Sequence, residues 1–149
     1  MTKPDFAYDT YIRTTPEKLW AALTEGEFTR RYFHATEVRS SWKVGDPVVY
    51  HDGSGKTVVD GEVLEAEPPR RLAITWKVYW SEALSAEPPS RVTFEIEASG
   101  EVCGLRVRHD RFEPGSQVFE EIRAGWPAIL GSLKSLLETG QALPLAGNA

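Results

Sequence analysis

Apolar and polar residues alternate along much of the chain in the way that is typical of β-strands. Tyr8, Thr10 and Ile12 form the first such run, and the period of two returns from 35 to 112, interrupted by turn residues at intervals typical of an antiparallel meander. Gly61 lies inside a strand-like run and predicts a bulge or a sharp bend. The clearest apolar faces comprise Leu72, Ile74, Trp76, Val78 and Trp80, then Val92, Phe94 and Ile96, then Leu105, Val107 and His109.

A helix signal follows the first strand. Thr15 offers an N-cap, Pro16 suits the first helical position, and Glu17 places an acid in the first turn. We expect a short helix that ends at Gly26, followed by one or two further helical turns over 27–33.

Near the C-terminus the period changes from two to that of a helix. At 100° per residue nine apolar side chains fall in one stripe, which predicts a strongly amphipathic helix with Gly140 as its stop. Pro127 removes one hydrogen bond inside this helix and predicts a kink near Gly125. Residues 141–149 read as a flexible tail. The stripe consists of Val118, Phe119, Ile122, Trp126, Ile129, Leu130, Leu133, Leu136 and Leu137.

One arrangement hides both apolar faces: a curved antiparallel sheet of about six to seven strands wrapped around the long C-terminal helix. The fold class is therefore predicted to be α+β, with the two short helices after the first strand. Large side chains such as Trp76, Trp80 and Trp126 can hold the helix away from the sheet, so the interior is either a cavity or a filled core.

Length and composition are those of one globular domain. The 149 residues are 41% hydrophobic and 26% charged, and we expect residues 1–149 to form a single domain with an ordered core over about 6–140. No run is apolar enough for a membrane span, and the start lacks the features of a signal peptide. With Cys103 as the only cysteine, no internal disulfide forms, so we expect a cytoplasmic protein.

Charge argues against one class of partner. The net charge is −5, and acidic and basic residues are interspersed along the chain. Nucleic-acid binders usually present a clustered basic face, so no nucleic-acid partner is predicted.

The order of these segments resembles the helix-grip domains of the START/Bet v 1-like (SRPBCC) superfamily, and within it the group related to the C-terminal domain of the activator of Hsp90 ATPase. The resemblance runs from about Tyr8 to Gly140. It is carried by Thr15-Pro16-Glu17-Lys18-Leu19-Trp20, Gly61-Glu62-Val63, Pro68-Pro69-Arg70-Arg71-Leu72, Thr75-Trp76, His109-Asp110-Arg111-Phe112 and Gly125-Trp126-Pro127-Ala128-Ile129-Leu130.

The resemblance implies a cavity between sheet and helix, and roles that range from binding lipids or polyketide-like molecules to occasional cyclase chemistry. Many members have a double glycine where this chain has Gly45-Asp46. Chaperone-activating relatives also carry a separate N-terminal domain that these 149 residues do not include, so an Hsp90-type chaperone is not an expected partner.

Chemical motifs are sparse. Residues 53–57 end like a phosphate-binding loop but precede a strand, whereas a nucleotide loop opens a helix, so a hairpin turn is favoured. The histidines His34, His51 and His109 are too scattered for a helical ligand pair, and Cys103 is a lone thiol. We predict no catalytic residue, no metal site and no cofactor.

The sequence therefore favours non-catalytic binding of a hydrophobic aromatic, polyketide-like or lipid molecule. His109 is expected to face inward, either as a hydrogen-bonded core residue or as a polar anchor for the ligand. Two alternatives stay open: a cyclase or hydrolase with His109 as general base, and an Hsp90-ATPase-activator-like protein interaction module, which rests on the family resemblance alone. A homodimer is a further candidate partnership. The predicted ligand-binding residues are Trp76, Trp80, Phe94, His109, Ile122, Trp126, Ile129 and Leu133.

Overall fold

A computed structural model describes residues 3–144. The last part of the predicted tail, 145–149, lies outside the described residues. The protein is an α+β domain built on a seven-stranded antiparallel sheet with the order β1-β7-β6-β5-β4-β3-β2. The strands are β1 (Phe6–Ile12), β2 (Glu37–Arg39), β3 (Pro47–His51), β4 (Thr57–Glu67), β5 (Arg71–Val78), β6 (Ser90–Ser99) and β7 (Val102–Asp110), and the helices are α1 (Pro16–Thr24), α2 (Gly26–Tyr32), α3 (Glu82–Ser85) and α4 (Gln117–Thr139).

The two short helices follow β1, as the sequence predicts. Thr15 caps α1, because its Oγ1 accepts a hydrogen bond of 3.2 Å from the Lys18 amide. The predicted role of Gly26 as the stop of this helix is wrong: α1 ends at Thr24, and Gly26 begins α2. A Cβ at this position would lie 3.0 Å from the Val38 carbonyl oxygen, so glycine serves here to let α2 lie close to β2.

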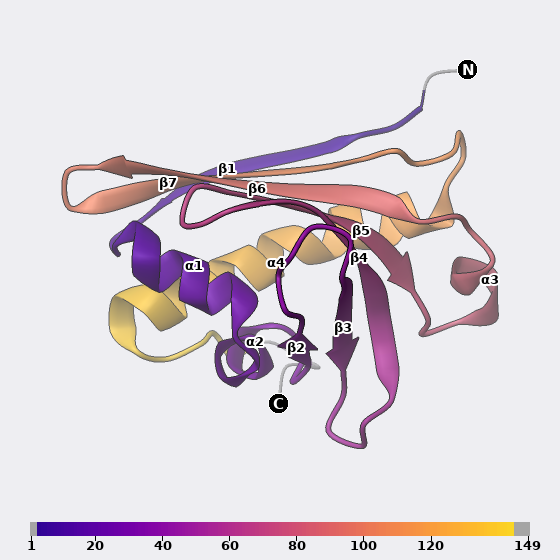
Figure 1. Ribbon diagram of the computed structural model, residues 1–149, viewed down its shortest axis with the longest axis horizontal. Helices are drawn as coiled ribbons and strands as arrows, with labels where there is room; N and C mark the ends of the chain where they lie inside the picture. Colours follow the sequence, from indigo (N-terminus) through magenta and orange to yellow (C-terminus); the bar gives the residue numbers. More distant parts are fainter. Residues whose placement is uncertain (1–2, 145–149) are drawn as a thin grey trace.

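The sheet bends sharply where β4 crosses the front of the molecule. A Cβ on Gly61 would lie 1.8 Å from the carbonyl oxygen of Thr75 on β5, and the pairing of β4 with β5 shifts register between Val63 and Glu65. The strand is therefore irregular as predicted, but its bulge lies between Val63 and Glu65 and not at Gly61 itself. In Figure 1 strands β1, β6 and β7 run across the top while β3 and β4 turn downward, so the sheet curls over α4.

The fifth strand is shorter than its alternation predicts. β5 ends at Val78, and Trp80 lies beyond it with 47% of its surface exposed. The sequence also gave no sign of α3, a single turn capped by Ser81, whose Oγ accepts from the Leu84 amide at 3.1 Å. The sequence pattern does not predict α3, because a single helical turn is too short to show a repeating spacing of apolar residues.

Helix α4 fills the concave face and is held at both ends. At its start, the Glu87 carboxylate accepts from the amides of Gln117 at 2.8 Å and Val118 at 3.3 Å. At its end, Gly140 takes a left-handed conformation with φ of 85°, and the carboxylate of Glu138 accepts from the Arg13 amide at 2.9 Å. The helix is continuous through Pro127.

Most of the predicted stripe is buried in the core, together with residues from every strand. The first residues of the predicted tail fold back onto α4, since the Leu143 amide donates to Ser132 Oγ at 3.2 Å. Over residues 3–144 no helix has the length and apolar character that crossing a membrane would require.

Candidate functional site

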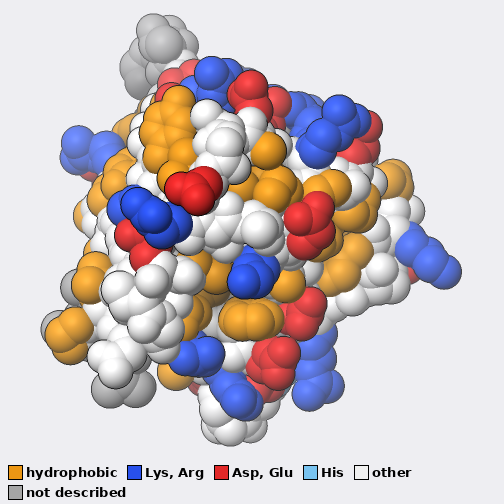
Figure 2. Space-filling model, turned by 90° about the vertical axis from the view of Figure 1, so that its left-hand side faces the viewer, with side chains coloured by type: hydrophobic (Ala, Val, Ile, Leu, Met, Phe, Trp, Pro, Cys, Tyr) orange, Lys and Arg blue, Asp and Glu red, His pale blue; other side chains and the backbone are white. Residues whose placement is uncertain are grey.

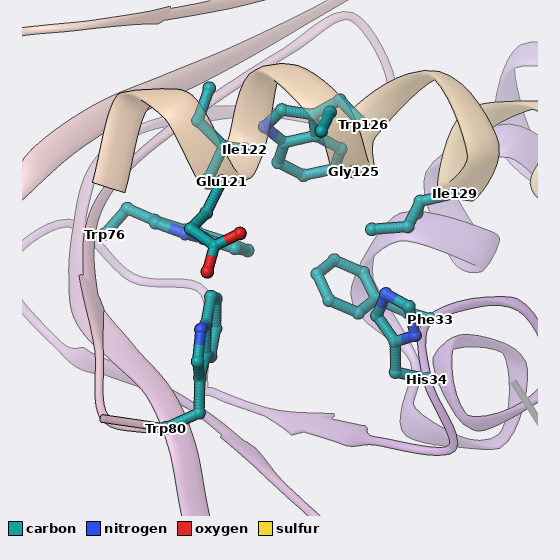
Figure 3. Close-up of a pocket in the computed structure, with 10 residues that line it drawn as sticks. Phe33, His34, Trp76, Trp80, Glu121, Ile122, Gly125, Trp126 and Ile129 are labelled. Atoms are coloured by element: carbon teal, nitrogen blue, oxygen red, sulfur yellow. The ribbon is translucent and has the colours of Figure 1, made fainter. Parts of the chain in front are cut away.

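A pocket of about 470 Å³ opens between α4, the end of β5 and the connection from α2 to β2 (Figure 3). Trp76 comes from β5 and Trp80 from the segment after it, while Phe33 and His34 follow α2. Helix α4 supplies the remaining wall, namely Glu121, Ile122, Ala124, Gly125, Trp126 and Ile129.

The deep end of the pocket is a cluster of packed aromatic rings. The centroid of the Trp126 ring lies 5.5 Å from that of Trp76 and 5.7 Å from that of Phe33, in edge-on or tilted geometry. Trp76 and Trp126 are only 2% and 3% exposed. Such pairs are favourable beyond their buried area, so the rings at this end of the pocket stabilise one another's positions.

The mouth of the pocket is more open and more polar. Trp80 and His34 are exposed there, and His34 has a left-handed backbone with φ of 48°. Glu121 is exposed too, and Figure 3 shows its carboxylate directed toward the edge of the Trp80 ring, beside Trp76.

Behind the pocket, the Trp126 indole belongs to a buried hydrogen-bond chain. Its Nε1–H donates to Nδ1 of His109 at 3.0 Å, and Nε2 of His109 lies 2.7 Å from Ser90 Oγ. Ser90 Oγ donates in turn to the Trp76 carbonyl at 3.2 Å. Because Nδ1 must accept and the serine proton is already used, His109 is the neutral tautomer that carries its proton on Nε2.

Burial fixes the protonation state of this imidazole. His109 is fully buried, and desolvation lowers its pKa to about 3, against a small opposing effect from the Asp110 carboxylate. A neutral ring with both nitrogens engaged has no lone pair left for a substrate proton.

One polar atom beside the pocket lacks a partner. Nε1 of Trp76 is buried and makes no hydrogen bond among the described residues. A buried donor without an acceptor costs about 1–3 kcal/mol, so this atom lowers the stability of the fold.

A family model for activator of Hsp90 ATPase homolog 1-like proteins matches residues 13–138. The chain belongs to this family. The match begins directly after β1 and covers the other six strands and nearly all of α4, so it includes every residue that lines the pocket.

Solved structures agree with the helix-grip fold of the family. Protein MLL2253 from Mesorhizobium loti is 26% identical, with a TM-score of 0.76, over 90% of this chain and 96% of that one. The Aha1 dimer from Colwellia psychrerythraea is 19% identical, with a TM-score of 0.75, over 93% and 99%. An Hsp90 activator from Plasmodium falciparum, PFC0360w, is 23% identical, with a TM-score of 0.66, over 82% and 86%. Among curated proteins, none matches the sequence.

The structure of this family member brings five of the eight predicted site residues to the pocket. Trp76, Trp80, Ile122, Trp126 and Ile129 line it. The other three lie in the core instead: Phe94 packs against the Trp126 ring at 6.0 Å, while His109 and Leu133 are fully buried.

Sequence reasoning missed five residues of the wall. Phe33 and His34 come from the connection between α2 and β2, far from β5 and α4 in the sequence, and only the packing of α2 could have placed them. Glu121, Ala124 and Gly125 border the predicted stripe of α4, and their nearness to Trp126 on a helix was the available signal.

The remaining motifs add no chemistry to this site. Residues 52–56 form the turn between β3 and β4, in which Asp52 Oδ1 accepts from the amides of Ser54 and Lys56, so the hairpin prediction is confirmed. Burial raises the pKa of the Cys103 thiol, which is buried and hydrogen-bonded to the Thr14 carbonyl at 3.3 Å. Within residues 3–144 no cluster of metal-ligating side chains is present.

Proposed function

We propose that the protein binds a hydrophobic aromatic small molecule in the pocket between α4 and the sheet, without chemical turnover. The observation that carries this is the aromatic end of the pocket, where Phe33, Trp76 and Trp126 hold one another in place. Pockets of a few hundred Å³ with apolar walls and few polar groups are typical of small-molecule sites. Flat rings are also good partners for tilted and edge-on aromatic contacts.

The enzyme alternative has little support from this site. His109, its suggested base, is buried behind Trp126 with both ring nitrogens engaged, so a substrate in the pocket cannot reach it. The ionisable groups on the pocket wall are Glu121 and His34, and both stand at the open mouth, where water competes for them.

A substitution that fills the pocket with a larger side chain tests the proposal. A Cβ on Gly125 would meet nothing within 4 Å, so a side chain can leave the helix here, and Gly125→Phe adds a ring at a position that lines the pocket. Replacing a helical glycine also favours the helix. The matched control is Ala128→Phe, because Ala128 is exposed on the same helix and does not line the pocket.

Ligand titrations would be followed by the fluorescence of the native tryptophans, three of which line the pocket. We expect saturable quenching by neutral tricyclic aromatics for the wild type and for Ala128→Phe, and at least a ten-fold loss of affinity for Gly125→Phe. Equal affinity for all three folded proteins would place the binding elsewhere and contradict the proposal.

Two further predictions from the sequence stay proposals. The pairing of two copies is supported by the Colwellia relative, whose structure is of a dimer. A cytoplasmic location rests on the single, reduced cysteine.

A further inference from the structure

The charge on the pocket wall has one sign. Glu121 is the carboxylate of the lining, and no lysine or arginine lies on this wall among residues 3–144. Glu121 itself makes no ion pair and no hydrogen bond within the described chain, although the neighbouring Glu120 is paired with Arg123 at 2.7 Å. The carboxylate at the mouth is therefore available to a ligand.

The aromatic side chains of the pocket also favour a positively charged ligand. The face of an indole or phenyl ring is electron-rich and attracts cations, tryptophan most strongly. Figure 3 places Trp76 and Trp80 on either side of the Glu121 carboxylate, so an ammonium group paired with this carboxylate would lie close to two indole rings. The Glu121 carboxylate would repel an anion at this point, within a protein of net charge −5.

We propose that the pocket selects a flat aromatic ligand that carries one positive charge. The ring of the ligand occupies the aromatic end, and its ammonium group lies at the mouth between Glu121 and Trp80. This inference rests on the proposed binding function and adds the charge of the ligand to it.

Three ligands with the same ring system separate charge from shape. 9-(Aminomethyl)anthracene is a cation in neutral buffer, 9-(hydroxymethyl)anthracene is neutral, and anthracene-9-carboxylate is an anion. Their binding is measured by anthracene fluorescence anisotropy. We expect the cation to bind about five-fold more tightly than the neutral compound, the anion to bind most weakly, and the preference to shrink as salt is added.

The variant Glu121→Gln keeps the size of the side chain and removes its charge. We expect it to lower the cation-to-neutral ratio at least about two-fold, because the ammonium group then loses the carboxylate and keeps only the aromatic rings. Glu120→Gln is the matched control, since that carboxylate lies on the same helix outside the pocket. His34→Gln removes the other ionisable group of the lining and should keep the preference for the cation.

The outcomes distinguish this inference from the function on which it rests. If the neutral compound binds and Gly125→Phe abolishes its binding, but the wild type shows no preference for the cation, the charge inference is overturned and the binding function stands. A cation preference of the same size in Glu121→Gln and in the wild type also overturns it. If none of the three compounds binds to the folded protein, both proposals fail.

Figure 2 shows how charged side chains are distributed on one face of the molecule. On the face that it displays, Lys and Arg side chains are mixed with Asp and Glu over the whole surface, with no area of a single sign.

Discussion

Acid should destabilise this protein through one buried group, His109. Desolvation lowers the pKa of its imidazole from 6.5 to about 3 in the folded state. In the unfolded chain the ring is in water and takes up a proton as the pH falls below about 6.5. The unfolded state then binds more protons than the folded state, so the free energy of unfolding falls as the pH is lowered through this range.

The size of the effect follows from the shift in pKa. Each unit of difference corresponds to about 1.4 kcal/mol, so going from pH 7 to pH 5 should remove roughly 2 kcal/mol of stability through His109 alone. This is a large part of the roughly 5–15 kcal/mol that holds a typical domain together. Carboxylates such as Asp9 and Asp110, whose pKa values are lowered by hydrogen bonds from Arg108 and Arg91, add their own losses only below about pH 4.5.

Urea unfolding at pH 7, 6 and 5 measures this slope. The control is His109→Gln, which keeps an amide for hydrogen bonding and has no titratable group at this position. Subtracting its slope from that of the wild type removes the contributions of every other residue. Should the variant fold poorly, the imidazole resonances of His109 in the wild type provide a second measurement, and they should not titrate between pH 7 and pH 5. A wild-type slope equal to that of the variant, or an imidazole that titrates near pH 6, would refute the reasoning.

Two substitutions test the packing around the pocket. Trp126→Phe removes the donor to His109 Nδ1 and should cost about 1–3 kcal/mol of unfolding free energy, less than the roughly 3–5 kcal/mol expected for Trp126→Ala; a urea midpoint equal to that of the wild type would show that this hydrogen bond adds nothing. Gly61→Ala forces a Cβ against the Thr75 carbonyl and should lower stability by several kcal/mol. Gly53→Ala, which meets open space in a turn, should change it by less than about 0.5 kcal/mol in the same melts, and similar losses for both would contradict the close approach at Gly61.

The elements of the fold could be predicted because their signals are local. The alternation of β1, the N-cap at Thr15 and the stripe of α4 each depend on residues near in sequence. The prediction that Gly26 ends α1 was wrong because glycine is required here for a different reason. The backbone of β2 passes so close that a Cβ would lie 3.0 Å from the Val38 carbonyl oxygen, and no local sequence pattern reveals that contact. The alternating pattern placed Trp80 on β5, but the strand ends at Val78.

The site was harder to predict than the fold. A helical stripe shows which side of α4 is apolar, but it does not show where the sheet touches the helix and where it stands away. Leu133 lies where the sheet closes on the helix, and Ile129, one turn earlier, borders the pocket. His109 alternates inward as expected, yet Trp126 and Ser90 occupy its nitrogens, a consequence of tertiary packing alone.

Helix α4 is held by hydrogen bonds at both ends and lacks one backbone hydrogen bond near its middle. Glu87 clamps the first turn, and Arg13 and Arg31 hold the last turn and the Gly140 carbonyl. Pro127 cannot donate to the carbonyl four residues before it, and this missing bond lies directly beside Trp126 at the pocket wall. Bending at that point changes the width of the pocket without releasing either clamp. We therefore expect the pocket to admit ligands of different thickness at little expense to the remainder of the fold.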